Sequence, residues 1–138
     1  MKAISISLSA TLRTLVLALL TISLMTACSK SKDEKKGGGF EGVYEGKWGE
    51  EFDEPAYHYK LRFKSGGTLE RLDESDVVIA SGQWSRNGID VEGYYIFLDD
   101  GSKFSFAGLY TDFDGAILGN WGFDNSKANG GTFEIKKK

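Results

Sequence analysis

Apolar and polar residues alternate along the chain from residue 40 onward, in short runs separated by glycine and Asx turn residues. Alternation with a period of two is typical of β-strands that bury one face. The turn segments are short, for example Arg86-Asn87-Gly88 and Asp99-Asp100-Gly101, so each strand should pair with its neighbour in sequence. The pattern predicts eight strands, at about 42–48, 56–64, 67–72, 77–85, 89–98, 103–110, 115–123 and 131–136.

A repeated glycine–aromatic spacing indicates that these strands form a closed sheet. A spacing of two places both residues on one face of a strand, and glycine gives the strand room to bend. Eight hairpin-connected strands would otherwise leave two exposed edges. We therefore predict an all-β, eight-stranded antiparallel up-and-down β-barrel at residues 40–138, without substantial helix; the alternative is an open, twisted meander with one solvated face. The spacing occurs in five pairs: Gly46/Trp48, Gly82/Trp84, Gly93/Tyr95, Gly108/Tyr110 and Gly119/Trp121.

Strand parity assigns one face of each strand to the barrel interior. In the third strand Leu69 and Leu72 have opposite parity, which predicts a β-bulge there. Outside that strand the inward face has no Asp, Glu, His or Lys, and it holds 14 of the 18 aromatic residues, so rings should largely hold the fold together. The inward residues are Tyr44, Trp48, Tyr57, Tyr59, Leu61, Phe63, Val78, Ala80, Trp84, Ile89, Val91, Tyr95, Phe97, Phe104, Phe106, Tyr110, Ile117, Trp121, Phe123, Phe133 and Ile135.

Two short motifs resemble those of lipocalin-like barrels, a calycin-type architecture. Gly46-Lys47-Trp48 is similar to the glycine–any–tryptophan motif of their first strand, and Thr111-Asp112-Phe113 is similar to a motif in the turn between strands six and seven. Avidin-like barrels also begin with such a strand and are equally similar. This chain departs from the lipocalin pattern, because it is shorter and has neither a C-terminal helix nor a late arginine. The resemblance covers the architecture of residues 40–138 and implies no particular ligand.

The N-terminal segment resembles a bacterial lipoprotein signal. The run Leu24-Met25-Thr26-Ala27-Cys28 is similar to a lipobox, and it follows basic residues and an apolar stretch from Leu15 that is short for a membrane span. We expect cleavage before Cys28, which removes residues 1–27 as a lipoprotein signal peptide, and lipidation of Cys28. Since Cys28 is the only cysteine, the chain can form no internal disulfide.

A polar, glycine-rich segment joins Cys28 to the predicted barrel. Residues 28–39 carry the lipidated cysteine and have nothing to bury, so we expect a flexible tether. Within it, Lys32-Asp33-Glu34 resembles a tag that directs some Gram-negative lipoproteins to the outer face of the outer membrane; the alternative is a solvated linker. The predicted location is the bacterial cell envelope, with a lipid anchor in the outer membrane and exposure at the cell surface as the further option.

Charge and residue types exclude several function classes. Residues 40–138 carry 11 Lys and Arg against 18 Asp and Glu, and an acidic domain argues against a nucleic-acid partner. His58, the only histidine, alternates with Lys60 and Arg62 and is expected on the solvated outer face. No nucleophile–base set, no zinc-ligand spacing and no cofactor motif is present, so we predict no catalytic residues, no metal and no cofactor.

Alternate loops of an up-and-down barrel fall at the same end, and here one end is acidic. This acidic rim would attract a cationic ligand or a basic protein surface, unless its carboxylates serve only turn formation and solubility. Its members are Glu50, Glu51, Asp53, Glu54, Asp73, Glu74, Asp76, Asp99, Asp100 and Asp124. Just inside it, the aromatic side chains that we expect to bind a ligand are Trp48, Tyr57, Phe97, Phe104, Phe123 and Phe133.

Three functions compete. The first is a lipid-anchored binding protein that captures a small apolar or cationic ligand at the barrel mouth. The second is a surface-displayed interaction module or protease inhibitor that acts through the acidic rim. The third, an enzyme, ranks last. A cavity of roughly 300 Å³ or more would support ligand capture. A barrel filled by its own side chains would instead favour the second function, in which the rim loops bind a protein partner.

Overall fold

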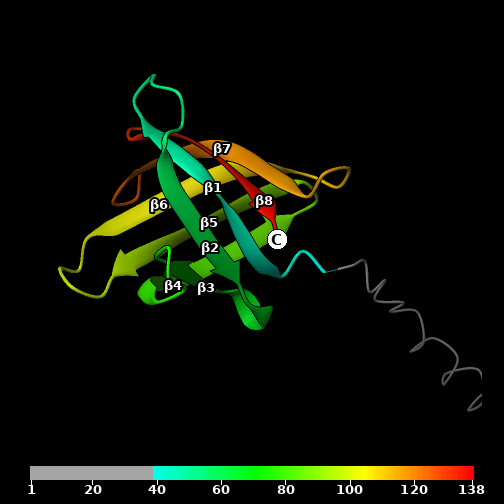
Figure 1. The fold of residues 1–138 in the computed structure, drawn as a ribbon, viewed down its shortest axis with the longest axis horizontal. Helices are drawn as coiled ribbons and strands as arrows, with labels where there is room; N and C mark the ends of the chain where they lie inside the picture. The colour runs from blue at the N-terminus through cyan, green and yellow to red at the C-terminus, as the bar shows by residue number, and fades with distance from the viewer. Residues whose placement is uncertain (1–38) are drawn as a thin grey trace, which may run out of the picture. The chain divides into compact units, whose positions relative to one another are not determined.

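The computed structural model describes residues 39–138; the predicted signal peptide, Cys28 and residues 29–38 of the tether lie outside the described residues. The described part is all-β and its strands form a single closed barrel (Figure 1). Its only helical element is a 3₁₀ turn at Ser65–Gly67, and it contains no helix that is long and apolar enough to cross a membrane. The strands are β1 (Gly42–Glu50), β2 (Tyr57–Phe63), β3 (Thr68–Leu72), β4 (Val78–Asn87), β5 (Asp90–Phe97), β6 (Lys103–Thr111), β7 (Ala116–Phe123) and β8 (Gly131–Lys137).

Every strand pairs antiparallel with its neighbour in sequence, and β1 closes the barrel by pairing with β8. The register places Tyr44 opposite Leu61 in β2, and Trp48 opposite Phe133 in β8. Residues that we assigned to the interior are therefore paired with one another both in β1–β2 and in the β1–β8 pairing that closes the barrel. These observations confirm the predicted eight-stranded antiparallel barrel and exclude the open meander.

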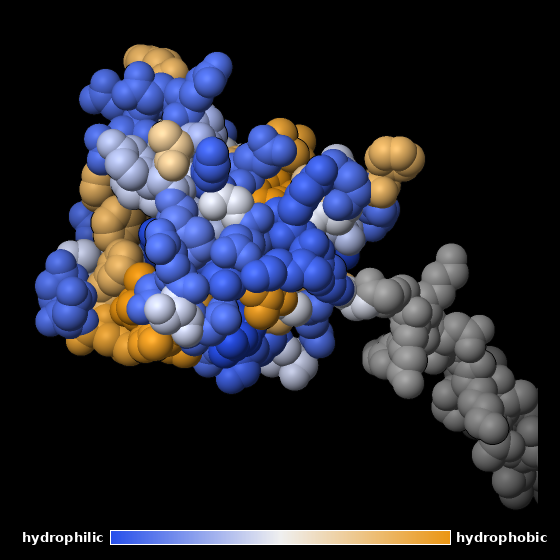
Figure 2. Space-filling view, in the orientation of Figure 1, coloured by the Kyte–Doolittle hydropathy of each residue, from blue (hydrophilic) through white to orange (hydrophobic). Residues whose placement is uncertain are grey.

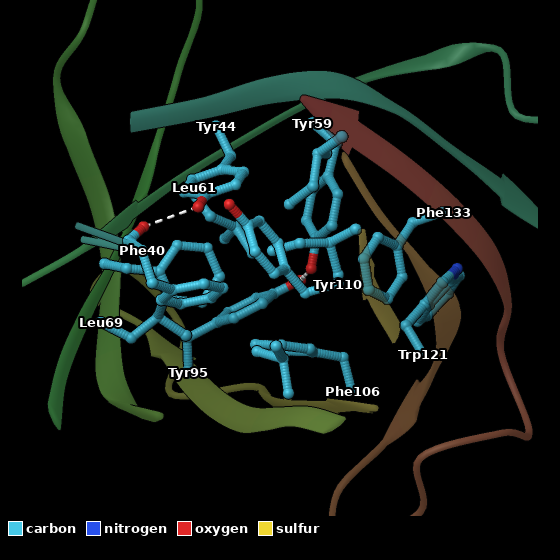
Figure 3. Close-up of a cluster of buried hydrophobic side chains, with 14 of the residues drawn as sticks. Phe40, Tyr44, Tyr59, Leu61, Leu69, Tyr95, Phe106, Tyr110, Trp121 and Phe133 are labelled. Atoms are coloured by element: carbon cyan, nitrogen blue, oxygen red, sulfur yellow. Dashed lines mark hydrogen bonds between the residues drawn. The ribbon is translucent and has the colours of Figure 1, made fainter. Parts of the chain in front are cut away.

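Aromatic side chains fill the barrel (Figure 3). Phe106 is fully buried near the middle, with its ring centroid 6.3 Å from that of Phe63 and 5.7 Å from that of Phe133, both in edge-to-face contact. Such edge-to-face pairs are favourable beyond the area they bury. Trp121 is buried as well, while Trp48 and Trp84 are partly buried and pack against the core.

Phe40, which precedes β1, closes one end of the barrel. Its ring lies 5.0 Å from that of Trp84 and 5.2 Å from that of Tyr110, and its carbonyl accepts a 2.6 Å hydrogen bond from the Tyr44 hydroxyl. The Arg86 guanidinium lies over the rings of both Phe40 and Tyr110. We call this the closed end; the sequence pattern marked Phe40 as the first residue of the domain without assigning it this role.

A β-bulge was predicted in the third strand, but β3 alternates regularly along β2 and the irregularity lies in β4 where it pairs with β3. Leu69 lies opposite Phe63, and Arg71 lies opposite Leu61, so both face inward. Alternation continues to Leu72, which lies on the outer face opposite Lys60. The register with β4 shifts between Arg71 and Leu72, because their partners are Ala80 and Val78 and the residue between these two is extra. Val78 was assigned to the interior, and that was wrong: the extra residue places it on the outer face opposite Leu72. Lys60 lies on the outer face as alternation predicts, but it is only 3% exposed and contacts Asp76 at 2.7 Å.

Three residues assigned to the interior are about half exposed. Ile89 lies in the turn that precedes β5, where strand parity no longer applies. Tyr57 and Phe123 are terminal residues of β2 and β7, at the end of the barrel opposite Phe40. Parity predicts the face of a strand residue, but it does not predict whether the barrel end above that residue is covered.

An ion cluster on the outer face links the first two strands to the C-terminus. The Glu45 carboxylate lies 3.0 Å from His58 Nε2, 2.6 Å from Lys138 Nζ and 3.6 Å from Lys60 Nζ. Hydrogen bonds from Lys138 and His58 lower the pKa of Glu45 from 4.5 to about 2. Because the folded-state value lies below the unfolded one, this carboxylate stabilises the fold above pH 4.5, and the contribution is lost as the pH falls toward 2.

We therefore expect the free energy of unfolding to decline between pH 4.5 and about 2, and Glu45→Gln to make that decline shallower. Urea unfolding at a series of pH values measures the effect. Glu50→Gln, at an exposed position without an ion pair in the described part of the chain, is the control and should leave the decline unchanged. An identical decline in Glu45→Gln and the wild type would show that this cluster does not govern acid stability.

Candidate functional site: a cavity at the open mouth

The barrel end opposite Phe40 carries the β1–β2, β3–β4, β5–β6 and β7–β8 loops, and we call it the open mouth. A continuous series of aromatic rings from β2, β1, β7, β6 and β5 borders it, with neighbouring centroids 4.9 to 5.5 Å apart. Figure 2 shows hydrophobic side chains gathered at the end of the barrel where β5 and β6 are joined. The rings, in order, are Tyr57, Trp48, Trp121, Phe123, Phe104 and Phe97.

A cavity of about 100 Å³ lies just inside the open mouth. This is well below the 300 Å³ that would enclose a whole ligand, so only a small chemical group can enter and the remainder of a molecule would lie over the rings of the mouth. Seven side chains line it: Trp48, Tyr59, Arg71, Tyr95, Phe97, Phe104 and Trp121.

Arg71 provides the only charge in this lining. Its Nη1 donates a 2.8 Å hydrogen bond to the Tyr95 hydroxyl, and its guanidinium carbon lies 4.7 Å from the centroid of the Tyr59 ring and 5.6 Å from that of Phe97. Its Nε is buried and has no hydrogen-bond partner. Within the described residues no carboxylate lies within ion-pair distance of Arg71.

The Tyr59 phenol at the base of the cavity does not supply the missing negative charge. The Tyr59 and Tyr95 hydroxyls lie 3.4 Å apart (Figure 3). Burial raises the pKa of Tyr59 well above its ordinary value, and the neighbouring Tyr95 raises it further, so the Tyr59 phenol stays neutral at physiological pH. The cavity therefore combines apolar walls with one guanidinium and hydroxyl groups.

The six predicted ligand-binding residues occupy three kinds of place. Trp48, Phe97 and Phe104 line the cavity itself. Tyr57 and Phe123 belong to the ring series at the mouth but lie outside the lining. Phe133 is almost fully buried deeper in the barrel, against the rings of Tyr59 and Phe106.

The ten carboxylates of the predicted acidic rim all lie in or beside the four loops of the open mouth. Four of them have local partners. Asp73 accepts hydrogen bonds from two backbone amides of its own turn, Asp99 and Asp100 accept one each, and Asp76 pairs with Lys60. Within residues 39–138 no three acidic or histidine side chains converge as metal ligands. The remaining rim residues are exposed: Glu50, Glu51, Asp53, Glu54, Glu74 and Asp124.

Sequence reasoning missed Arg71, although one signal could have found it. The tight turn at 64–67 places Leu69 opposite Phe63, and alternation then places Arg71 on the same inward face. The conflicting parity of Leu72 left the strand unassigned.

Comparisons of the chain with protein-family models, with curated proteins and with solved structures found no match.

Proposed function

We propose that this protein is a lipid-anchored envelope binding protein that captures a small ligand at the mouth of its β-barrel. The observation that carries the proposal is the asymmetry of the two ends. Phe40 and Arg86 cover one end, whereas the other end opens through a series of aromatic rings into a cavity of about 100 Å³. Concave apolar sites with a few polar groups are typical of ligand pockets.

The cavity size sets the kind of ligand. Dry apolar cavities of roughly 150 Å³ bind molecules the size of benzene, so a cavity of about 100 Å³ accepts one planar or short aliphatic group. The rings of Trp48, Tyr57 and Phe123 at the mouth would cover the protruding part of the molecule, because rings favour stacked or edge-to-face contact.

The anchor and the entry point of the chain support an envelope role. The lipobox at Cys28 and the tether after it favour attachment to the outer membrane, and Lys32-Asp33-Glu34 supports exposure at the cell surface. The chain enters the barrel through Phe40 at the closed end, so the open mouth lies at the end of the domain opposite the tether attachment.

Tryptophan fluorescence tests the proposal, because Trp48 and Trp121 line the cavity and Trp84 packs at the closed end. The purified full-length chain is titrated with benzene derivatives that carry neutral, anionic or cationic substituents. We expect at least one of them to change the emission saturably. Trp84→Phe should keep that change, and the double variant Trp48→Phe/Trp121→Phe should lose it.

The proposal is wrong if no probe gives a saturable change up to about 10 mM, or if the change depends on Trp84. A thermal shift is the independent measurement, since a ligand at 100 times its Kd stabilises the folded state by about 2.7 kcal/mol.

The second candidate is a surface-displayed interaction module or protease inhibitor that acts through the acidic rim. It is favoured by Phe52, which is fully exposed in the β1–β2 loop among Glu51, Asp53 and Glu54, and by the projection of that loop beyond the barrel (Figure 1). An exposed ring surrounded by carboxylates suits a basic protein surface. Failure of all small probes would favour this candidate.

A further inference from the structure

Arg71 carries a positive charge without a counter-charge in the cavity. A guanidinium stays protonated at any physiological pH. The Arg71 side chain is partly buried and its Nε is fully buried, and burying part of a charged group without an anionic partner is unfavourable. Its contacts with the rings of Tyr59, Tyr95 and Phe97 offset part of that cost. The closed end offers a comparison, because Arg86 also lies over two rings but reaches the Gly88 carbonyl at 2.6 Å and Asp112 at 3.8 Å.

Hydrogen-bond donors exceed acceptors around Arg71. A guanidinium has five N–H donors and no acceptor, and the described structure gives Arg71 one side-chain partner, the Tyr95 hydroxyl. Its buried Nε–H has none. Buried donors are nearly always paired in native proteins, so a ligand that enters this cavity gains most if it brings an acceptor with a negative charge.

We propose that the ligand is an organic carboxylate whose carboxyl group enters the cavity and binds the Arg71 guanidinium, with its apolar part between Trp48, Phe97 and Phe104. This inference rests on the proposed ligand capture and names its substrate class. It replaces the cationic ligand that the acidic rim suggested. A planar carboxylate matches the planar guanidinium, and its single charge is less costly to desolvate among apolar rings than that of a doubly charged phosphate.

The acidic rim does not exclude an anion. Its six exposed carboxylates are solvated and are screened over a distance of about 8 Å at physiological salt, whereas the Arg71 contact is made inside the cavity. The rim should slow the approach of an anion, and added salt should relieve that repulsion. We therefore expect the association rate of a carboxylate probe to rise with salt, opposite to the behaviour of a cationic ligand.

Calorimetric titration of the full-length chain with four probes of similar shape tests the inference: benzoate, benzamide, benzylamine and phenyl phosphate. Charge-assisted hydrogen bonds are roughly twice as strong as neutral ones, so we expect benzoate to bind at least about tenfold more tightly than benzamide. Benzylamine should bind more weakly still.

Arg71→Met keeps much of the side-chain volume and removes the charge and the donors. We expect it to weaken benzoate at least about tenfold, to change benzamide by no more than about twofold, and to raise the melting temperature of the ligand-free protein. Arg86→Met is the matched control at the closed end and should leave benzoate binding unchanged. Arg71→Lys keeps the charge but not the planar group, and it should recover only part of the affinity.

The outcomes separate the inference from the proposed function. Equal binding of benzoate and benzamide by the wild type, or unchanged benzoate binding in both Arg71 variants, would overturn the carboxylate assignment and leave ligand capture intact. Tighter binding of phenyl phosphate than benzoate would also overturn it. Absence of binding by all four probes would refute ligand capture itself, and the inference with it. If an Arg71 variant fails to fold, the comparison of benzoate with benzamide and phenyl phosphate on the wild-type protein still tests the carboxylate assignment.

Discussion

Replacing Phe106 with alanine is expected to lower the free energy of unfolding by about 3–5 kcal/mol, the usual cost of removing a buried ring. Phe106 is completely buried, and it contacts the rings of Phe63 and Phe133. A methyl group built on Gly93 would lie 2.9 Å from the Phe106 ring, so this glycine leaves space for it. The barrel wall is hydrogen-bonded all the way round and cannot readily collapse into the resulting void.

Chemical denaturation followed by circular dichroism measures the loss, and the denaturant dependence should be unchanged if only stability is altered. Phe113→Ala is the matched control, because Phe113 is fully exposed in the β6–β7 turn and its truncation should change stability by no more than about 0.5 kcal/mol. A loss below about 1 kcal/mol for Phe106→Ala would show that the barrel interior is more loosely packed than its ring contacts indicate.

Most of the fold could be predicted because two independent local signals agree. Alternation gives the strands and their inward faces, and short turns force neighbouring strands to pair. The glycine–aromatic pairs then favour closure, since the positions of Gly46 and Gly119 have no room for a side chain beside the backbone of the next strand. Agreement between local pattern and global topology is what makes a sequence specify one structure.

Only the aromatic part of the candidate site could be predicted from the sequence. The other features were missed because the alternation of apolar and polar residues does not determine them. The aromatic residues of the mouth follow from parity and from the strand ends. Arg71 does not, because Leu69 and Leu72 are both apolar but lie on opposite faces of the strand, so the apolar pattern alone does not assign its inward face. Phe40 lies before the first strand, so no periodicity applies to it, and Lys60 is buried by Asp76, a residue of the following loop.

A filled interior and a small cavity have the same cause. The residues that close the barrel are glycines at points where two backbones nearly touch, and a tightly curved eight-stranded barrel encloses little more than its own side chains. The cavity of about 100 Å³ lies at the open mouth, where the side chains lining the interior include Arg71 among the rings. The affinity of the cavity for any ligand therefore depends on a few contacts at one end of the molecule.

Replacing Gly82 with alanine should destabilise the barrel by about 3 kcal/mol or more, at the upper end of the cost of overpacking. Gly82 lies in β4 opposite Tyr95 of β5 and Leu69 of β3, and a methyl group there would lie 1.9 Å from the Tyr94 carbonyl oxygen and 2.7 Å from the Tyr95 Cα. These are backbone atoms, so the clash can be relieved only by moving two hydrogen-bonded strands apart.

Gly101→Ala separates this clash from the general cost of losing a glycine. Gly101 lies in the β5–β6 turn at a φ of +74°, with nothing within 4 Å of an added methyl group, so its replacement should cost only the backbone strain of about 1–2 kcal/mol. Thermal and denaturant unfolding of both variants measure the difference. Equal losses would mean that β4 and β5 separate easily, and that glycine at position 82 does not set the curvature of the barrel. A larger loss of unfolding free energy for Gly82→Ala than for Gly101→Ala would support the view that close contact between strands curves the sheet tightly and leaves little space inside the barrel.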